Sequence, residues 1–123
     1  MSIMLEDELS KKVLGACFEV SNTLGVGFLE SVYHRALLVE MDNLDLAYTS
    51  QQKMEVKYKG VIVGDFIPDI IVQNKIILEL KVAHSISNEM TAQLMNYLKA
   101  SGIRLGYVIN FGKSKLEWKR IVM

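Results

Sequence analysis

Two apolar segments joined by three polar residues most limit what this chain can fold into. The segments run from Val61 to Val72 and from Ile76 to Val82, and residues 73–75 (QNK) join them. Both are apolar at nearly every position next to the join, which is typical of strands covered on both faces of a sheet. Because three residues are too few for a crossover, the two strands are predicted to pair antiparallel.

The rest of the sequence predicts the helices that supply this cover. Apolar residues recur at three- and four-residue steps from Leu5 to Leu24 and again from Leu29 to Met41, a spacing typical of amphipathic helices. Ser85 to Asn88 offers capping side chains for a third helix over 88–101. Strand-forming patterns predict strands at 52–58, 61–72, 76–82, 104–111 and 116–122.

These elements follow one another in the order α-α-β-β-β-α-β-β. The tight joins between the three middle strands predict an antiparallel meander, and the helix at 88–101 carries the chain across to a further strand beside them. The fold class is therefore α/β, a mixed sheet with helices on both faces. A chain of 123 residues has room for one hydrophobic core, so we expect residues 1–123 to form a single domain.

Composition argues against several other classes of protein. Half of the residues are hydrophobic and 23% are charged, as in a folded globular protein rather than a disordered one. No apolar run approaches the roughly 20 residues that cross a bilayer, and the acidic start does not resemble a secretory signal. Cys17 is the only cysteine, which excludes an intrachain disulfide and a cysteine-rich zinc site. We therefore expect a cytoplasmic protein without a membrane partner.

The net charge of zero conceals an uneven distribution. Residues 1–45 contain eight acidic and three basic side chains, a balance of −5, and residues 46–123 have a balance of +5. A positive second half would suit a polyanionic partner such as nucleic acid. Lysines that keep strand surfaces soluble would give the same balance, so the charge does not decide between these interpretations.

Three charged residues interrupt the apolar strands. Asp69, Glu79 and Lys81 each have neighbours that should belong to the core, where ionised groups are rare unless they are paired or bind a metal. Glu79 and Lys81 are two positions apart, so their side chains share a face. If residues 73–75 form a three-residue loop, Asp69 lies directly opposite Glu79. A two-residue loop would instead send Glu79 to the other face of the sheet.

A close pair of carboxylates predicts a metal site, because the two groups repel each other unless one is protonated or a cation lies between them. Hard oxygen ligands favour Mg²⁺ or Mn²⁺ over zinc. Lys81 would orient or deprotonate a water molecule and stabilise charge on a phosphate. The alternative is a Glu79–Lys81 salt bridge, since a Glu-x-Lys triplet alone is common by chance. Pro68, the only proline, favours the site because proline inside a strand marks an edge or a bulge.

The same residues resemble a known signature. Pro68-Asp69, nine residues, and then Glu79-Leu80-Lys81 resemble the motif of the PD-(D/E)XK nuclease superfamily. Residues 27–33 read G-x-x-E-x-x-Y, the motif that names the GxxExxY proteins, and residues 93–97 resemble the Q-x-x-x-Y helix motif of several nuclease branches. The resemblance runs over nearly the whole chain and implies a restriction-endonuclease-like fold.

The resemblance implies a role for each matching residue. Asp69 and Glu79 would ligate Mg²⁺ (or Mn²⁺), with the backbone carbonyl of Leu80 as a further ligand, and Lys81 would position the attacking water. Glu30 matches a helix glutamate that often completes the metal site in this superfamily.

Helical spacing, independent of the resemblance, places Glu30 on the stripe of Tyr33 and Leu37, pointing toward the core. The alternative for Glu30 is an ordinary acidic residue favoured by the helix dipole.

Gln93 and Tyr97 lie on one side of the helix at 88–101 and would steady the catalytic lysine or contact nucleic acid. A buried hydrogen bond between helix and sheet is an equal alternative for Gln93, and a core aromatic is the alternative for Tyr97. We interpret Tyr33 as a core aromatic with a satisfied hydroxyl, and His34 as a surface or boundary residue.

The function expected from this pattern is metal-dependent hydrolysis of phosphodiester bonds in nucleic acid, with DNA favoured. The alternative is a non-catalytic nucleic-acid-binding or assembly module on the same scaffold, since a fold does not fix a function. The small domain and its sheet edges favour a homodimer or a partner protein.

Overall fold

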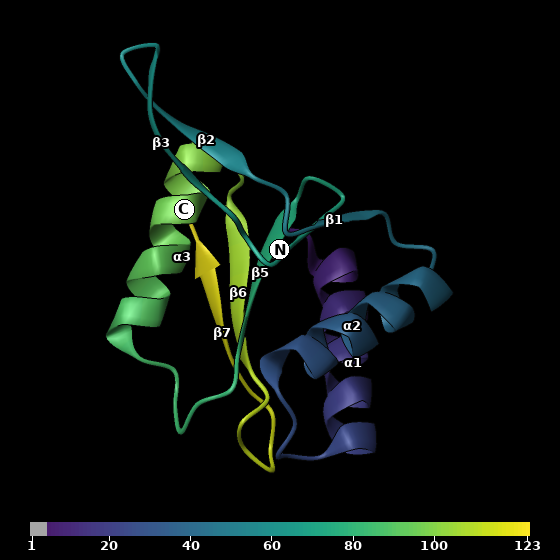
Figure 1. The fold of residues 1–123 in the computed structure, drawn as a ribbon. Helices are drawn as coiled ribbons and strands as arrows, with labels where there is room; N and C mark the ends of the chain where they lie inside the picture. Colours follow the sequence, from purple (N-terminus) through teal and green to yellow (C-terminus); the bar gives the residue numbers. More distant parts are fainter. Residues whose placement is uncertain (1–4) are drawn as a thin grey trace.

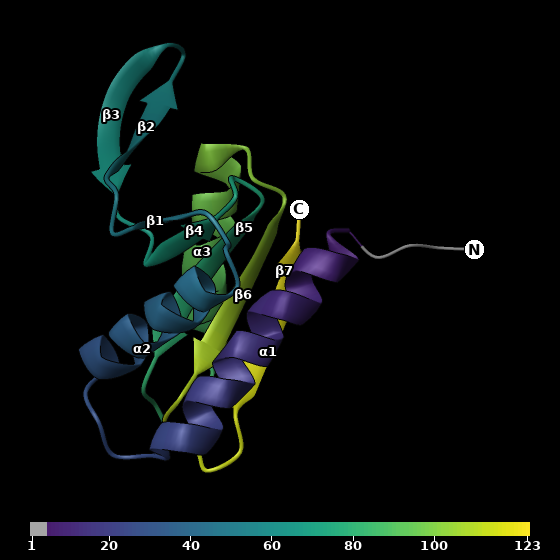
Figure 2. The same ribbon diagram turned by 90° about the vertical axis from the view of Figure 1, so that its right-hand side faces the viewer.

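The computed structural model describes residues 5–123, in which a mixed sheet lies between two layers of helix (Figure 1). α1 (Asp7–Leu24) and α2 (Glu30–Asn43) pack on one face of the sheet, and α3 (Asn88–Ser101) packs on the other. In the view turned by 90°, α1 and α2 lie in front of the sheet and α3 lies behind it (Figure 2). The predicted α/β class, with helices on both faces of a mixed sheet, is confirmed.

The central sheet has five strands in the order β1-β4-β5-β6-β7. They are β1 (Tyr48–Ser50), β4 (Ile70–Val72), β5 (Ile76–Lys81), β6 (Leu105–Asn110) and β7 (Glu117–Val122). β5 pairs antiparallel with β4 and parallel with β6, and α3 makes the crossover between the parallel strands. Nearly every residue of β5 and β6 is buried, as predicted for strands covered on both faces.

The two faces of the sheet form separate cores. Leu78 packs with Leu37 in the core beneath α1 and α2, whereas Ile77 packs with Leu94 in the core beneath α3. A Cβ atom at Gly106 would lie 2.8 Å from a methyl carbon of Leu94. Glycine at this position of β6 therefore allows α3 to approach the sheet closely.

The ends of α3 agree with its predicted caps. The hydroxyl of Ser87 accepts a hydrogen bond from the N–H of Met90 at 3.1 Å, which satisfies one donor of the first turn. Gly102 follows the helix with a left-handed backbone (φ 77°), and its N–H donates to the carbonyl of Leu98. Within residues 5–123, no helix combines the length and the apolar character that crossing a membrane requires.

The prediction of one strand over 61–72 is wrong. The chain leaves the strand conformation at residues 67–69 and so divides into β3 (Val61–Phe66) and β4, which belong to different sheets. Pro68 has no N–H to donate to a neighbouring strand, so the strand cannot continue through it. β4 pairs instead with β1, a strand that the sequence did not predict. The three-stranded meander is wrong for the same reason, and only its last antiparallel pair, β4 with β5, lies in the central sheet.

β2 (Met54–Tyr58) and β3 form a second, two-stranded sheet that projects beyond the central one (Figures 1 and 2). The residues from Val61 to Val63 are between 56% and 63% exposed, although all three are apolar. The base of this hairpin is attached to α3, where the rings of Phe66 and Tyr97 stack with their centroids 4.5 Å apart.

Candidate metal centre

The loop between β4 and β5 sets the register on which the site depends. Val72 pairs with Ile76, so residues 73–75 form a three-residue loop, as one of the two predicted alternatives requires. Continuing that register brings Asp69, just before β4, opposite Glu79 in β5. The two-residue alternative is therefore wrong.

The two carboxyl groups are held by the backbone of the opposite segment. The N–H of Leu80 donates a hydrogen bond to Asp69 Oδ2 at 2.7 Å, and the N–H of Asp69 lies 3.4 Å from Glu79 Oε1. Glu79 is only 4% exposed. Burial, and then the negative charge of Asp69, raise the pKa of Glu79 to about 8. A carboxyl group perturbed in this way by burial and a charged neighbour is typical of a functional site.

Lys81 is the last residue of β5 and is partly buried. Its side chain lies on the same face of the strand as Glu79 and Ile77, toward α3. The four ion pairs found within residues 5–123 involve neither Glu79 nor Lys81. The simple Glu79–Lys81 salt bridge, which was the alternative interpretation of this pair, is therefore not formed.

Glu30 is exposed at the first position of α2, so the expectation that it points into the core is wrong. Tyr33 and Leu37 are fully buried, but Glu30 lies where the helix begins and the loop before it offers no cover. Glu30 is nevertheless close enough to the site for its pKa to respond. Burial and the charge of Asp69 raise that pKa, and the charge of Lys81 lowers it.

Glu30 does not complete a three-residue cluster with the other two carboxylates. Among residues 5–123, no group of three or more His, Cys, Asp or Glu side chains is arranged to hold a metal ion. The charges that shift the pKa of Glu30 are those of Asp69 and Lys81, so Glu30 lies near one carboxylate of the pair and near the lysine.

Tyr97 and Gln93 both lie on α3, on the side of the sheet that Glu79 faces. Burial raises the pKa of Tyr97, and the charges of Glu79 and Asp69 raise it further, so the phenol lies near both carboxyl groups. Its ring is also a packing group, because it stacks on Phe66. Gln93 is exposed on the surface of the helix.

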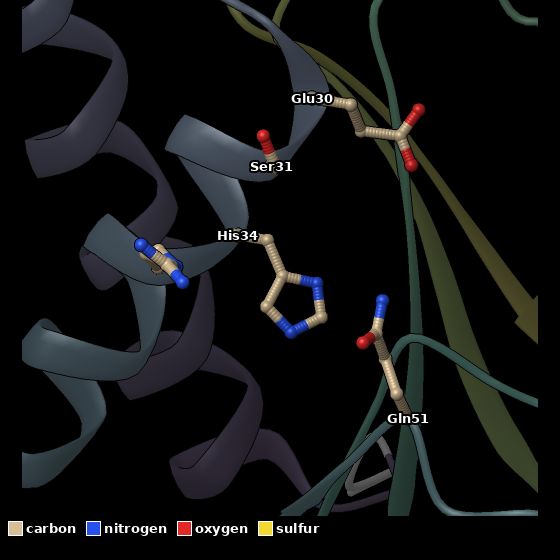
Figure 3. Close-up of a pocket in the computed structure, with 5 residues that line it drawn as sticks. Glu30, Ser31, His34 and Gln51 are labelled. Carbon is tan, nitrogen blue, oxygen red and sulfur yellow. The ribbon is translucent and has the colours of Figure 1, made fainter.

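His34 is the residue that the sequence interpretation missed. It is buried, with 8% exposure, and its Nε2 lies 2.8 Å from the hydroxyl of Ser50. Its ring lies with Glu30 and Gln51 around an open pocket of about 360 Å³ (Figure 3). Its position four residues after Glu30, on the same side of α2, is the only sequence signal that would have pointed to it.

Tyr33 is a core aromatic with a satisfied hydroxyl, in agreement with the sequence interpretation. Its hydroxyl donates a hydrogen bond of 2.6 Å to the carbonyl of Gly25, and its ring stacks on Phe111 with centroids 4.8 Å apart. These contacts anchor the loop that leads into α2, and through it the position of Glu30.

The atoms gathered here fit a hard divalent cation. The carboxylates of Asp69 and Glu79 and the carbonyl of Leu80 are oxygen donors, which Mg²⁺ and Mn²⁺ prefer, and such ions usually retain several water ligands. Burial and the charge of Asp69 favour a proton on Glu79. A bound cation would replace this proton and neutralise the two carboxylates.

Comparison with known proteins identifies the family and a similar fold. The family model described as the PD-(D/E)XK nuclease superfamily matches residues 7–121. Among solved structures, that of SSO0001 is similar, with a TM-score of 0.58 and 18% sequence identity over 95% of this chain. The chain spans 58% of the length of that structure, and at this identity the similarity concerns the fold alone. No curated protein matches the sequence.

The family match covers almost the whole described chain, including Asp69, Glu79 and Lys81, and the mixed sheet between helical layers is restriction-endonuclease-like. The chain therefore belongs to the PD-(D/E)XK nuclease superfamily.

Proposed function

We propose that this protein is a metal-dependent nuclease that hydrolyses phosphodiester bonds in nucleic acid, with DNA the favoured substrate. The observation that carries the proposal is a pair of adjacent carboxyl groups, the buried Glu79 and the partly buried Asp69, beside Lys81 at the end of β5. A structural role alone does not account for this pair, because removing the Glu79 carboxyl group from water costs free energy and no ion pair within residues 5–123 compensates it.

Asp69, Glu79 and the carbonyl of Leu80 are the proposed ligands of Mg²⁺ or Mn²⁺, with Glu30 approaching from α2. A bound divalent ion supplies Lewis-acid polarisation of a phosphoryl oxygen and lowers the pKa of a ligated water. Lys81 donates hydrogen bonds to the attacking water and to the phosphate, so that it places the nucleophile and stabilises developing negative charge. Tyr97 and Gln93, on α3, are proposed to contact the nucleic acid.

We further propose that the chain belongs to the GxxExxY group within the superfamily. The support is residues 27–33, in which Tyr33 anchors the loop and Glu30 lies beside the site. The motif would then combine a structural residue with one that assists at the metal centre.

A cleavage assay tests the proposal. Labelled single-stranded, double-stranded and flap substrates of DNA and RNA are incubated with Mn²⁺ or with EDTA. The wild type should cut at least one DNA substrate in Mn²⁺ and none in EDTA. Lys81→Ala should lower the rate by about 100-fold or more, because it removes the group that positions the water. Lys12→Ala, at an exposed lysine of α1, is the matched control.

The alternative, a non-catalytic binding or assembly module, predicts a different outcome. Such a protein would bind one of these substrates without cutting it, and Lys81→Ala would leave its behaviour unchanged. Circular dichroism of each variant shows whether a loss of activity is caused by unfolding.

We also propose a homodimer, formed through the β2–β3 hairpin. Within residues 5–123, no further strand pairs with either long edge of this small sheet, and an isolated two-stranded hairpin is marginally stable in water. The exposed apolar residues from Val61 to Val63 would be covered by a second copy of the same hairpin. Analytical ultracentrifugation should give a dimer for the wild type and a monomer for Ile62→Lys, and a monomeric wild type would refute the proposal.

A further inference from the structure

The pocket beside the metal centre has two walls. Glu30, Ser31 and His34 project from α2, and Gln51 lies across from them in the segment between β1 and β2 (Figure 3). Arg35, also on α2, is a further lining residue. The side chains of Ser31, Arg35 and Gln51 are exposed to this opening, whereas the ring of His34 is buried and forms its inner surface.

Both walls are tied to the strand that begins at the metal centre. The N–H of Gln51 donates a hydrogen bond of 2.9 Å to the carbonyl of Asp69, and Ser50 pairs with Ile70. The hydroxyl of Ser50 also lies 2.8 Å from His34 Nε2. The position of the pocket relative to Asp69 is therefore fixed by hydrogen bonds on both sides.

The backbone of Gln51 is held in an unusual conformation. Its φ of 52° lies in the left-handed region, which is strained for a residue other than glycine. The hydrogen bond to Asp69 maintains this conformation, and the side chain of Gln51 is directed to the pocket as a result (Figure 3). Backbone strain of this kind is often found where a side chain must be presented to a ligand.

The lining offers hydrogen-bonding groups and one cation. The amide of Gln51 both donates and accepts, the hydroxyl of Ser31 does the same, and the guanidinium of Arg35 carries a positive charge. None of the ion pairs found within residues 5–123 engages Arg35, so no carboxylate neutralises it there. A glutamine amide can pair with the edge of a base, and an arginine can bind a phosphate or stack on a base.

The volume of about 360 Å³ is at the low end of the range for small-ligand pockets. A pocket of this size accepts one nucleotide but not a base pair within a duplex. Bases in a duplex are stacked and unavailable to it, so only an unpaired or extruded base can enter.

We infer that this pocket is a subsite for a single unpaired nucleotide next to the scissile phosphate, with Gln51 on the base edge and Arg35 on the neighbouring phosphate. The inference rests on the proposed nuclease function and adds to it a substrate class, namely single-stranded or frayed nucleic acid. An intact duplex is then a poor substrate because it must first release a base.

Oligonucleotides that lack one base test this subsite. A single-stranded DNA of defined sequence is prepared with an abasic residue at each position in turn, and kcat/KM is measured in Mn²⁺. At one position next to the cleaved bond, removal of the base should lower kcat/KM by about tenfold or more. In Gln51→Gly that position-specific loss should shrink to less than about threefold, because the base no longer has its partner.

Glycine is the appropriate replacement because it adopts a left-handed backbone without strain, so the hydrogen bond to Asp69 is kept. Gln52→Ala, at the adjacent exposed residue outside the pocket, should keep the full wild-type loss. A wild type without any position-specific loss would overturn the inference, as would a Gln51→Gly variant with an undiminished one.

A binding readout separates this inference from the proposed nuclease function. Fluorescence anisotropy in Ca²⁺ measures the affinity of the same abasic series for the wild type and for Gln51→Gly, and does not depend on cleavage. Absence of cleavage in Mn²⁺ would refute the nuclease function alone. The nucleotide subsite is supported if an abasic residue at one position weakens binding to the wild type but not to Gln51→Gly. It is refuted if no position shows this difference between the two proteins.

Discussion

Glu79 is a buried carboxyl group whose pKa differs between the folded and the unfolded protein. It lies almost without contact with water, with Asp69 opposite it and Lys81 two positions further along the strand. In an unfolded chain the same group is fully hydrated and has its ordinary pKa of about 4.5. The folded protein without metal therefore holds a proton on Glu79 over a range of pH in which the unfolded chain has already lost it.

This difference predicts the pH dependence of the metal-free protein. Because the pKa of Glu79 is raised in the folded state, its protonation favours folding at pH values below about 4.5, and this contribution is lost as the pH rises toward about 8. In EDTA, the melting temperature should fall between pH 5.5 and pH 8.5. Glu79→Gln, which is always neutral, should remove most of this decline and be more stable than the wild type at pH 8.5.

Differential scanning calorimetry of the wild type and the variant measures both slopes. Glu55→Gln, at an exposed glutamate of β2, is the control that should keep the wild-type slope. If the melting temperatures of the wild type and of Glu79→Gln fall equally with pH, Glu79 is not the group that causes the pH dependence.

Gly112 occupies a position where no side chain fits. An added Cβ would lie 2.5 Å from the carbonyl oxygen of Ala83 and 2.6 Å from its nitrogen, and both are backbone atoms. Asn110 holds Ala83 in place by two hydrogen bonds of 2.9 Å, so the backbone cannot withdraw easily. Gly112→Ala should therefore lower the free energy of unfolding by about 1–3 kcal/mol in urea titrations. Gly64→Ala, which has nothing within 4 Å of the new Cβ, is the matched control, and equal losses in the two variants would contradict this explanation.

Helices and strands differ in how far the sequence alone predicts them. The three helices were predicted because each buries a long apolar stripe, and their spacing is a local property of the chain. β1 has only three residues, none of them buried, and exists because β4 pairs with it. The sequence did not predict that the strand over 61–72 divides at Pro68. The reason is that β3 and β4 join different sheets, and tertiary contacts decide which sheet each strand joins.

The candidate site divides in the same way. The register of Asp69 and Glu79 was predictable only as a condition. Side chains alternate along a strand, so a three-residue loop at 73–75 puts the two on one face, but the sequence alone left a two-residue loop open. The exposure of Glu30 and the burial of His34 were not predictable, because they depend on where α2 packs and on Ser50, a residue 16 positions away from His34.

α1 contains a glycine that its packing does not require. An added Cβ at Gly15 would meet no atom within 4 Å, and the residue lies in the interior of the helix. Alanine restricts the unfolded chain more than glycine does and suits a helix better. Gly15→Ala should raise the free energy of unfolding by about 0.5–1 kcal/mol, measured by urea denaturation. A destabilised variant would mean that α1 packs differently around this residue.

In the whole molecule, the central sheet and helices from both of its faces meet near the end of β5. The central sheet brings Asp69 and Glu79 together, α3 adds Tyr97 on one side, and α2 adds Glu30 and the pocket on the other. The pairing of β4 with β1 and with β5 ends at Ile70, and Asp69 lies just before that residue. At this end of the sheet, residues from both helical layers lie near the carboxyl pair. This arrangement places the proposed metal centre and the proposed nucleotide pocket side by side.

Calorimetric titration with Mn²⁺ shows whether Asp69 and Glu79 hold a divalent ion at all. Asp69→Asn is the decisive variant, since an asparagine oxygen can still accept the hydrogen bond from Leu80 while the charge is lost. The account predicts saturable binding to the wild type and to Glu55→Gln, and its loss in Asp69→Asn. A wild type that binds no Mn²⁺, or an Asp69→Asn variant that binds it as well as the wild type, would contradict the account.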